Sequence, residues 1–95
     1  MEASSGADLT FSGFVLSLAT TAAVHFGDLP DPSTGRKGDP DLASAARIIE
    51  LLTMLQEKTK GNLIEQEERL LDDLLYELRL RYVQGQQDDK RIIEP

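Results

Sequence analysis

The chain of 95 residues contains no cysteine, no tryptophan and a single histidine, His25. Without cysteine it has no disulfide bond, no thiolate nucleophile and no cysteine-ligated zinc or iron–sulfur site. One histidine also rules out a two-histidine metal site within one chain. The residues contain no catalytic constellation, no metal-ligand cluster and no phosphate-binding loop. We therefore expect a protein that is not an enzyme and that binds no metal, other cofactor or small molecule.

Basic residues are scarce: 10 Lys and Arg stand against 17 Asp and Glu, which gives a formal net charge of -7. Nucleic-acid binding depends on clustered positive charge, so we expect no nucleic-acid partner. The first residues, MEASSGAD, lack the positive region with which a secretory signal begins. These features favour a cytoplasmic location.

Charge is also missing from a long stretch near the start, residues 9–27, which reads LTFSGFVLSLATTAAVHFG. A membrane-spanning helix needs about 20 predominantly apolar residues. Much of this stretch consists instead of hydroxyl-bearing residues, glycine and histidine, and no Lys or Arg precedes it. We expect no stable membrane span and interpret the stretch as a helix covered by protein.

The first helix is predicted over residues 11–26. Asp8 or Thr10 can cap its free amide groups, and Gly27 can adopt the left-handed conformation that follows many helices. The next residues, rich in proline and glycine, favour turns over helix. They predict an ordered connector of about a dozen residues.

The second helix is predicted over residues 40–60. Asp39 suits the N-cap position, Pro40 suits the first helical turn, and Gly61 follows the end of the helix. Two lysines in the last turn complement the carbonyl end of the helix.

The third helix is predicted over residues 63–84, because Asn62 and Glu65 have the spacing of a capping box and Gly85 suits a helix stop. Residues 1–8 and 85–95 are polar and are expected to be disordered tails. Residues 9–84 are then one domain of the all-α class, a three-helix arrangement.

Helical periodicity places an apolar stripe on each helix. The core side of the first helix carries Phe11, Phe14, Val15, Leu18, Ala22 and Phe26. The second helix has a broad apolar arc formed by Leu42, Ala45, Ala46, Ile48, Ile49, Leu51, Leu52 and Leu55. The main stripe of the third helix consists of Leu63, Leu70, Leu71, Leu74, Leu75, Leu78 and Tyr82.

Two further sets of residues point away from these stripes and are our candidates for a partner interface. On the first helix they are small or weakly polar, which allows close approach of another backbone: Gly13, Ser17, Thr20, Thr21 and Val24. On the third helix they are the apolar residues Tyr76, Leu80 and Val83. Three short helices leave apolar surface uncovered on each of the three, which favours a symmetric homodimer. A heterologous partner helix, and a domain that packs on itself under its connector, are the alternatives.

The leading hypothesis is therefore a helical protein–protein interaction module that self-associates or is an accessory subunit of a larger assembly. The competing hypothesis is a small-molecule or metal-binding protein with a pocket near His25, Asp28 and Asp31, which are close in sequence. A histidine at the end of a helix is more often a hydrogen-bonded structural residue than a ligand.

Three segments together resemble a known family: FVLSLATTAAVHFGDLPDPSTG at 14–35, LLTMLQEKTKGNL at 51–63 and LLDDLLYELRLRYV at 70–83. They resemble a small bacterial family known as the domain of unknown function numbered eighteen forty-four. The resemblance implies a short cytoplasmic helical protein. This sequence differs from the family's pattern between the second and third predicted helices, where Ile64 and Glu65 replace the usual threonine and proline. The family has no established activity, so the resemblance implies no catalytic residue.

Overall fold

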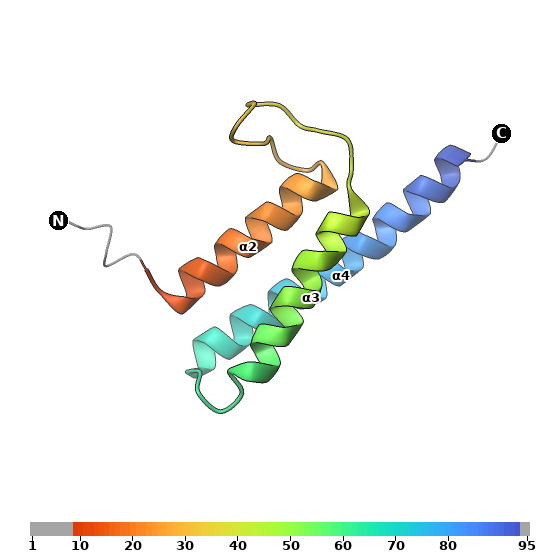
Figure 1. The fold of residues 1–95 in the computed structure, drawn as a ribbon. Helices are drawn as coiled ribbons and strands as arrows, with labels where there is room; N and C mark the ends of the chain where they lie inside the picture. The colour runs from red at the N-terminus through yellow and green to blue at the C-terminus, as the bar shows by residue number, and fades with distance from the viewer. Residues whose placement is uncertain (1–8, 94–95) are drawn as a thin grey trace.

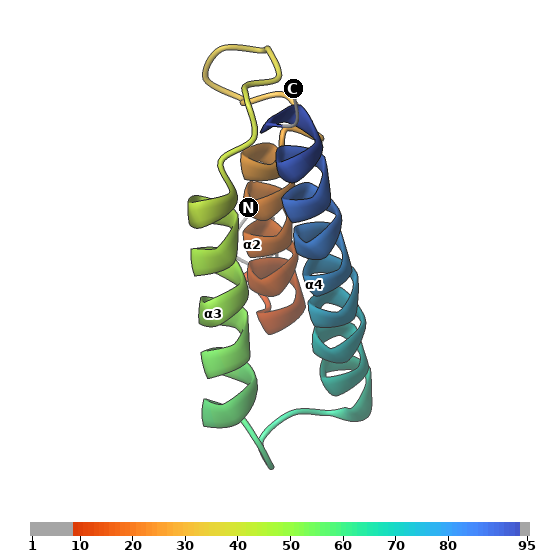
Figure 2. The same cartoon turned by 90° about the vertical axis from the view of Figure 1, so that its right-hand side faces the viewer.

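The computed structural model describes residues 9–93, which form three α-helices: α2 (Phe11–Phe26), α3 (Leu42–Lys58) and α4 (Glu65–Ile93). Each helix contacts the other two. Viewed from one side, α3 and α4 lie next to each other in front and α2 lies behind them (Figure 2). The prediction of an all-α, three-helix arrangement is confirmed, and the described residues contain no strand.

Helix α2 has the predicted bounds because both of its caps form. The Thr10 hydroxyl oxygen accepts a hydrogen bond from the Gly13 amide at 2.9 Å. At the other end Gly27 has a φ of 83°, and its amide donates to the Val24 carbonyl. None of the described helices is both long and apolar enough to cross a membrane.

Helix α3 begins at Leu42, after the predicted position 40, so the prediction of Asp39 as N-cap and Pro40 in the first turn is wrong. Asp41 is the N-cap, and its carboxylate accepts from the Ser44 amide at 3.1 Å. The Asp41 amide donates to the His25 carbonyl at the end of α2, at 2.7 Å. This bond holds the chain against α2 before the helix starts. The helix ends at Lys58, two residues before the predicted end.

Helix α4 begins at Glu65, and the predicted cap at Asn62 is also wrong. Ile64 precedes the helix, and its amide donates to the Glu67 carboxylate at 3.1 Å, which is one half of a capping box. Asn62 lies in the turn between α3 and α4, where its amide donates to the Thr59 carbonyl. The prediction chose Asn62 because its side chain has an oxygen that can accept a hydrogen bond. The residue that precedes the helix is instead Ile64, whose side chain has no oxygen.

The predicted helix end at residue 84 is wrong, because α4 continues through Gly85 to Ile93. Gly85 is buried inside the helix, and a Cβ atom there would stand 2.7 Å from the Cδ2 atom of Leu42. The glycine therefore allows close approach of α3 and does not end the helix. Of the predicted tails, 85–93 is helical, while 1–8 and 94–95 lie outside the described residues.

The core lies between the three helices and follows the predicted stripes, with two exceptions, Phe14 and Leu51, the second of which is 39% exposed. Phe14 is 50% exposed, because it lies at the edge of the core side of α2. Ala19 and Phe11 pack against the core instead. The buried residues are Val15, Ala22, Phe26, Ala45, Ile48, Leu52, Leu71, Leu75 and Leu78.

Candidate functional site

The small-residue side of α2, predicted as an interface, faces away from the core. Ser17, Thr20 and Thr21 are exposed there, and Gly13 and Val24 are half-buried. Each hydroxyl donates to a carbonyl of the same helix, with oxygen–oxygen distances of 2.7 to 3.0 Å. Because the hydroxyl protons are used inside the helix, this side offers methyl groups and small volume for packing, and no activated nucleophile.

The predicted line on α4 is also exposed, at 66% for Tyr76, 46% for Leu80 and 47% for Val83. These side chains share a hollow of about 330 Å³ with Asp72 and Arg79. A second hollow of about 430 Å³ shares Val83 and Arg79 with the first and is bordered by α3. We call the two together the α3–α4 groove; it is lined by Ala46, Ile49, Glu50, Asp72, Tyr76, Arg79, Leu80, Tyr82, Val83 and Gln86.

The structure does not bring the two predicted sets together. The α4 line belongs to the side where α3 and α4 meet, since Arg79 donates to the Thr53 hydroxyl of α3 at 2.9 Å. The small side of α2 belongs to a helix that lies behind α3 and α4 in Figure 2, and its residues are exposed or half-buried there. A single partner helix therefore contacts one set or the other.

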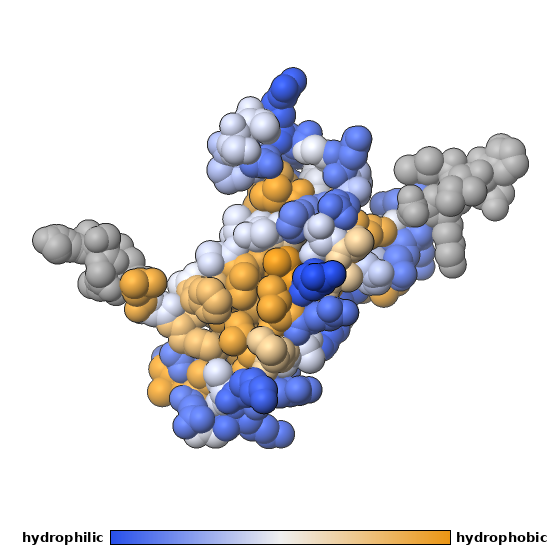
Figure 3. Space-filling model, viewed as in Figure 1, coloured by the Kyte–Doolittle hydropathy of each residue, from blue (hydrophilic) through white to orange (hydrophobic). Residues whose placement is uncertain are grey.

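A third apolar surface lies over α2 and α3 (Figure 3). Uncovered apolar surface on the second helix was expected, although its residues were not among the predicted interface residues. Large exposed apolar side chains on these helices include Phe14 of α2 and Leu51 and Met54 of α3. On α3 they continue a stripe that begins at Arg47 and ends at Lys58, with spacings of four, three and four residues. We call this surface the α2–α3 face. Its sequence signal was present, because the apolar arc of the second helix is wider than two neighbours cover.

The three residues of the competing ligand hypothesis are divided by the structure. His25 and Asp31 line a hollow of about 440 Å³ with residues of the connector. Hydrogen bonds from the Ser33 hydroxyl and amide lower the pKa of Asp31, so its carboxylate already stabilises a turn. Asp28 points to α4 instead. Among the side chains that the structure describes, no group of three or more His, Asp or Glu is arranged to hold a metal ion.

Asp28 is bound by Arg81 of α4, a contact that sequence reasoning missed. Arg81 Nε lies 2.8 Å from Asp28 Oδ2, and Arg81 Nη2 lies 2.9 Å from Asp28 Oδ1. The guanidinium also lies over the Phe26 ring, 5.0 Å from its centroid. The hydrogen bond from Arg81 lowers the pKa of Asp28 and raises that of Arg81. This contact joins the end of α2 to α4 and gives Asp28 a structural role.

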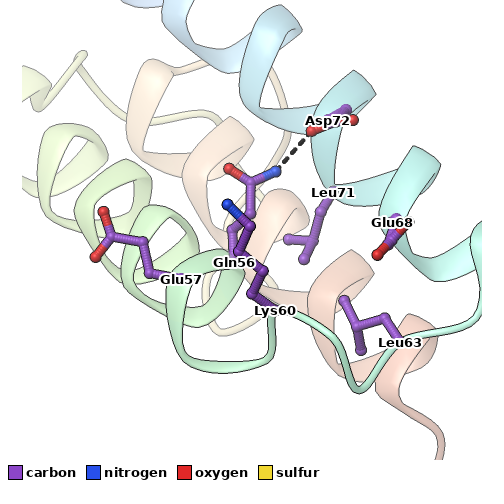
Figure 4. A pocket seen from close by; sticks show the side chains of 7 residues that line it. All are labelled: Gln56, Glu57, Lys60, Leu63, Glu68, Leu71 and Asp72. Carbon is purple, nitrogen blue, oxygen red and sulfur yellow. Dashed lines mark hydrogen bonds between the residues drawn. The ribbon is translucent and has the colours of Figure 1, made fainter.

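A further hollow of about 290 Å³ lies between the end of α3 and the start of α4 (Figure 4). Gln56 Nε2 donates to Asp72 Oδ1 at 2.6 Å across it. Leu63 and Leu71 provide its apolar part, and its remaining residues are Glu57, Lys60 and Glu68.

Comparison with known proteins gives one family. The model of the domain of unknown function DUF1844 matches residues 8–84. The chain belongs to this family. No curated protein and no solved structure matches the chain. The DUF1844 match covers α2, α3 and most of α4, and it ends one residue before Gly85, beyond which α4 continues.

Proposed function

We propose that this DUF1844 protein is a non-enzymatic cytoplasmic module for protein–protein interaction, which self-associates or is an accessory subunit of a larger assembly. One observation carries the proposal: a chain of 95 residues exposes many large apolar side chains, among them those of the α2–α3 face and the α4 line. Contiguous apolar surface of this kind is typical of sites that bind another protein.

The hydrogen bonds of nearby polar groups favour a role in protein binding over a role in catalysis. The hydroxyls of α2 are bonded to their own helix, and the carboxylates of Asp31 and Asp41 accept hydrogen bonds from Ser33 and Ser44. These hydrogen bonds are local, and they stabilise turns and helix ends. The exposed apolar side chains, in contrast, contribute no hydrophobic stabilisation until another protein buries them.

Size-exclusion chromatography with multi-angle light scattering tests the proposal at micromolar concentration, together with affinity purification from the native host. We expect a dimer, or a stoichiometric protein partner. Replacing Leu51 and Met54 with glutamate should weaken one interaction surface, whereas Gln66→Glu, an exposed change to glutamate in the first turn of α4, serves as the matched control. A monomer that co-purifies with no protein at native expression levels would contradict the proposal.

A further inference from the structure

We propose that a second copy of this chain packs against α4 in antiparallel orientation, across a two-fold axis near Tyr76 and Leu80. This inference rests on the proposed function and names the partner and the surface. The exposed side of α4 has the spacing of a helix–helix seam, because successive residues are four, three, four and three positions apart. These residues are Asp72, Tyr76, Arg79, Val83 and Gln86, with Leu80 beside them.

Charge is distributed unequally along this seam. Asp72 and Asp73 precede Tyr76, and Arg79 follows it. Within the described residues neither Asp72 nor Arg79 makes an ion pair: Asp72 accepts from the neutral Gln56 amide, and Arg79 donates to the neutral Thr53 hydroxyl. Both charges are held in place by α3 and remain available to an opposite charge from outside.

This distribution selects the orientation of the second copy. In a parallel pair, Asp72 lies opposite Asp72 and Arg79 opposite Arg79, so like charges repel. In an antiparallel pair, the acidic half of one seam lies along the basic half of the other, and two equivalent Asp–Arg pairs form. A two-fold interface requires such self-complementarity, since each residue's partner must be contacted in return. Tyr76 and Leu80 of the two copies then lie between the charge pairs, and Val83 lies beyond Arg79 toward each end of the contact.

The length of α4 adds a second argument. Eight residues, 86–93, follow the contact between Gly85 and Leu42, and at 1.5 Å per residue they extend about 12 Å beyond it. Figure 1 shows this end of α4 continuing past the first turn of α3. Short helical segments gain most of their stability from packing. A second α4 that runs antiparallel about this axis brings its first turns alongside the beginning of this segment and supplies a packing surface for that part of it.

The α2–α3 face does not have the same self-complementarity. Its stripe on α3 carries Arg47 at one end and Lys58 at the other, with Leu51 and Met54 between them. A second copy placed on this stripe, in either orientation, brings cations together. The α2–α3 face is therefore the control surface in the test.

Charge reversal measured by sedimentation equilibrium tests the proposal on the full chain. Arg79→Glu alone, and Asp72→Lys with Asp73→Lys, should each raise the dimer dissociation constant at least about tenfold, because each places like charges together. An equimolar mixture of the two variants should recover a dimer, since one seam is then acidic and the other basic. Glu77→Lys, an exposed charge reversal on another side of α4, should leave the constant unchanged.

Cross-linking locates the contact independently. The chain has no cysteine, so Leu80→Cys and Leu51→Cys each introduce a single thiol, on the seam and on the α2–α3 face respectively. A short bismaleimide should join two chains of Leu80→Cys and leave Leu51→Cys monomeric, with circular dichroism confirming that both variants fold. If the protein is a dimer whose dissociation constant does not change on charge reversal, or if only Leu51→Cys cross-links, the α4 seam is wrong. In both cases the proposed interaction function remains supported. A wild-type monomer overturns the seam as well, and co-purification then decides the function.

Discussion

Arg81 holds Asp28 through two parallel hydrogen bonds, although 53 positions separate the two residues in sequence. The same guanidinium donates to the Phe26 carbonyl at 3.4 Å and covers the Phe26 ring. One side chain therefore contacts three groups: the carbonyl of the last residue of α2, the carboxylate of the first residue after its C-cap, and the ring of Phe26 in the core. The planar guanidinium suits this role, because it presents two parallel N–H groups to the carboxylate, a geometry that an ammonium lacks.

Arg81→Lys should lower the free energy of unfolding by about 1 kcal/mol, because it removes the bidentate contact and weakens the interaction with the ring. Urea unfolding followed by circular dichroism measures the change. Arg69→Lys is the matched control, since its pair with Glu65 has side chains that are 70% and 79% exposed. We expect a change below about 0.5 kcal/mol there. Equal effects of the two substitutions would show that the Arg81 contact adds nothing to an ordinary surface pair.

Stability should fall in acid, and Asp28 should account for part of the fall. Arg81 holds the pKa of Asp28 below its ordinary value of 3.8, so the folded protein binds this proton less readily than the unfolded chain. The stabilisation is complete above pH 3.8 and is lost as the pH drops through the folded pKa. Asp28→Asn should therefore be less stable than the wild type at pH 7, and the two urea midpoints should converge toward low pH. Midpoints that stay a constant distance apart down to about pH 2 would exclude this linkage.

Asp41 gives a second test of acid sensitivity that leaves the helix cap in place. Its pKa is lowered by hydrogen bonds from the Ser44 hydroxyl and amide. Asparagine caps a helix about as well as aspartate and does not titrate. Asp41→Asn should thus keep most of the stability at pH 7 and reduce the dependence of the urea midpoint on pH below 3.8. An unchanged dependence would mean that the cap is not coupled to protonation.

The features that could be read from the sequence are those in which neighbouring residues act together. Thr10 and Gly27 bound α2 as predicted, because both the cap and the left-handed glycine act within one turn. The apolar stripes also became the core, because their periodicity reports which side of a helix is buried. The outward line of Tyr76, Leu80 and Val83 is exposed for the same reason.

The features that were missed depend on residues far apart in sequence. Glycine often follows the last residue of a helix, so Gly85 predicted a helix stop. Only the position of Leu42 explains why the helix continues through it. Asp28 was grouped with His25 and Asp31 because they are close in sequence, whereas its partner is Arg81. The start of α3 moved to Leu42 through the bond between the Asp41 amide and the His25 carbonyl. In each case tertiary contact outweighs a local preference.

Gly27 should tolerate alanine less well than Gly35 does. Both glycines have positive φ, 83° and 72°, so alanine is strained at either position by about 1–2 kcal/mol. At Gly27 a Cβ atom would also stand 3.1 Å from the Gly38 carbonyl oxygen, whereas nothing lies within 4 Å at Gly35. Gly27→Ala should therefore be the more destabilising change in urea unfolding. Equal losses would show that the connector moves away from Gly27 without cost.

Gly85 allows the close packing of α3 on α4 to be measured by a double-mutant cycle with Leu42. Alanine is favoured over glycine within a helix by about 1 kcal/mol, so Gly85→Ala should stabilise the protein wherever its Cβ atom fits. In the wild type the Cβ atom would stand 2.7 Å from Leu42 Cδ2, and the leucine must shift, which offsets the gain. In the Leu42→Ala background the obstruction is absent, and the gain of about 1 kcal/mol should appear in full.

The difference between the two backgrounds is the coupling free energy, which should be clearly nonzero if α4 is continuous through Gly85 and packs on Leu42. Gln87→Ala is the control: this exposed residue lies two positions further along α4, and its effect should be the same in both backgrounds. If the helix instead ended at residue 84, Gly85→Ala would show no coupling to Leu42. Urea unfolding of the four proteins of the cycle thus distinguishes a glycine that ends a helix from one that permits close contact between two helices.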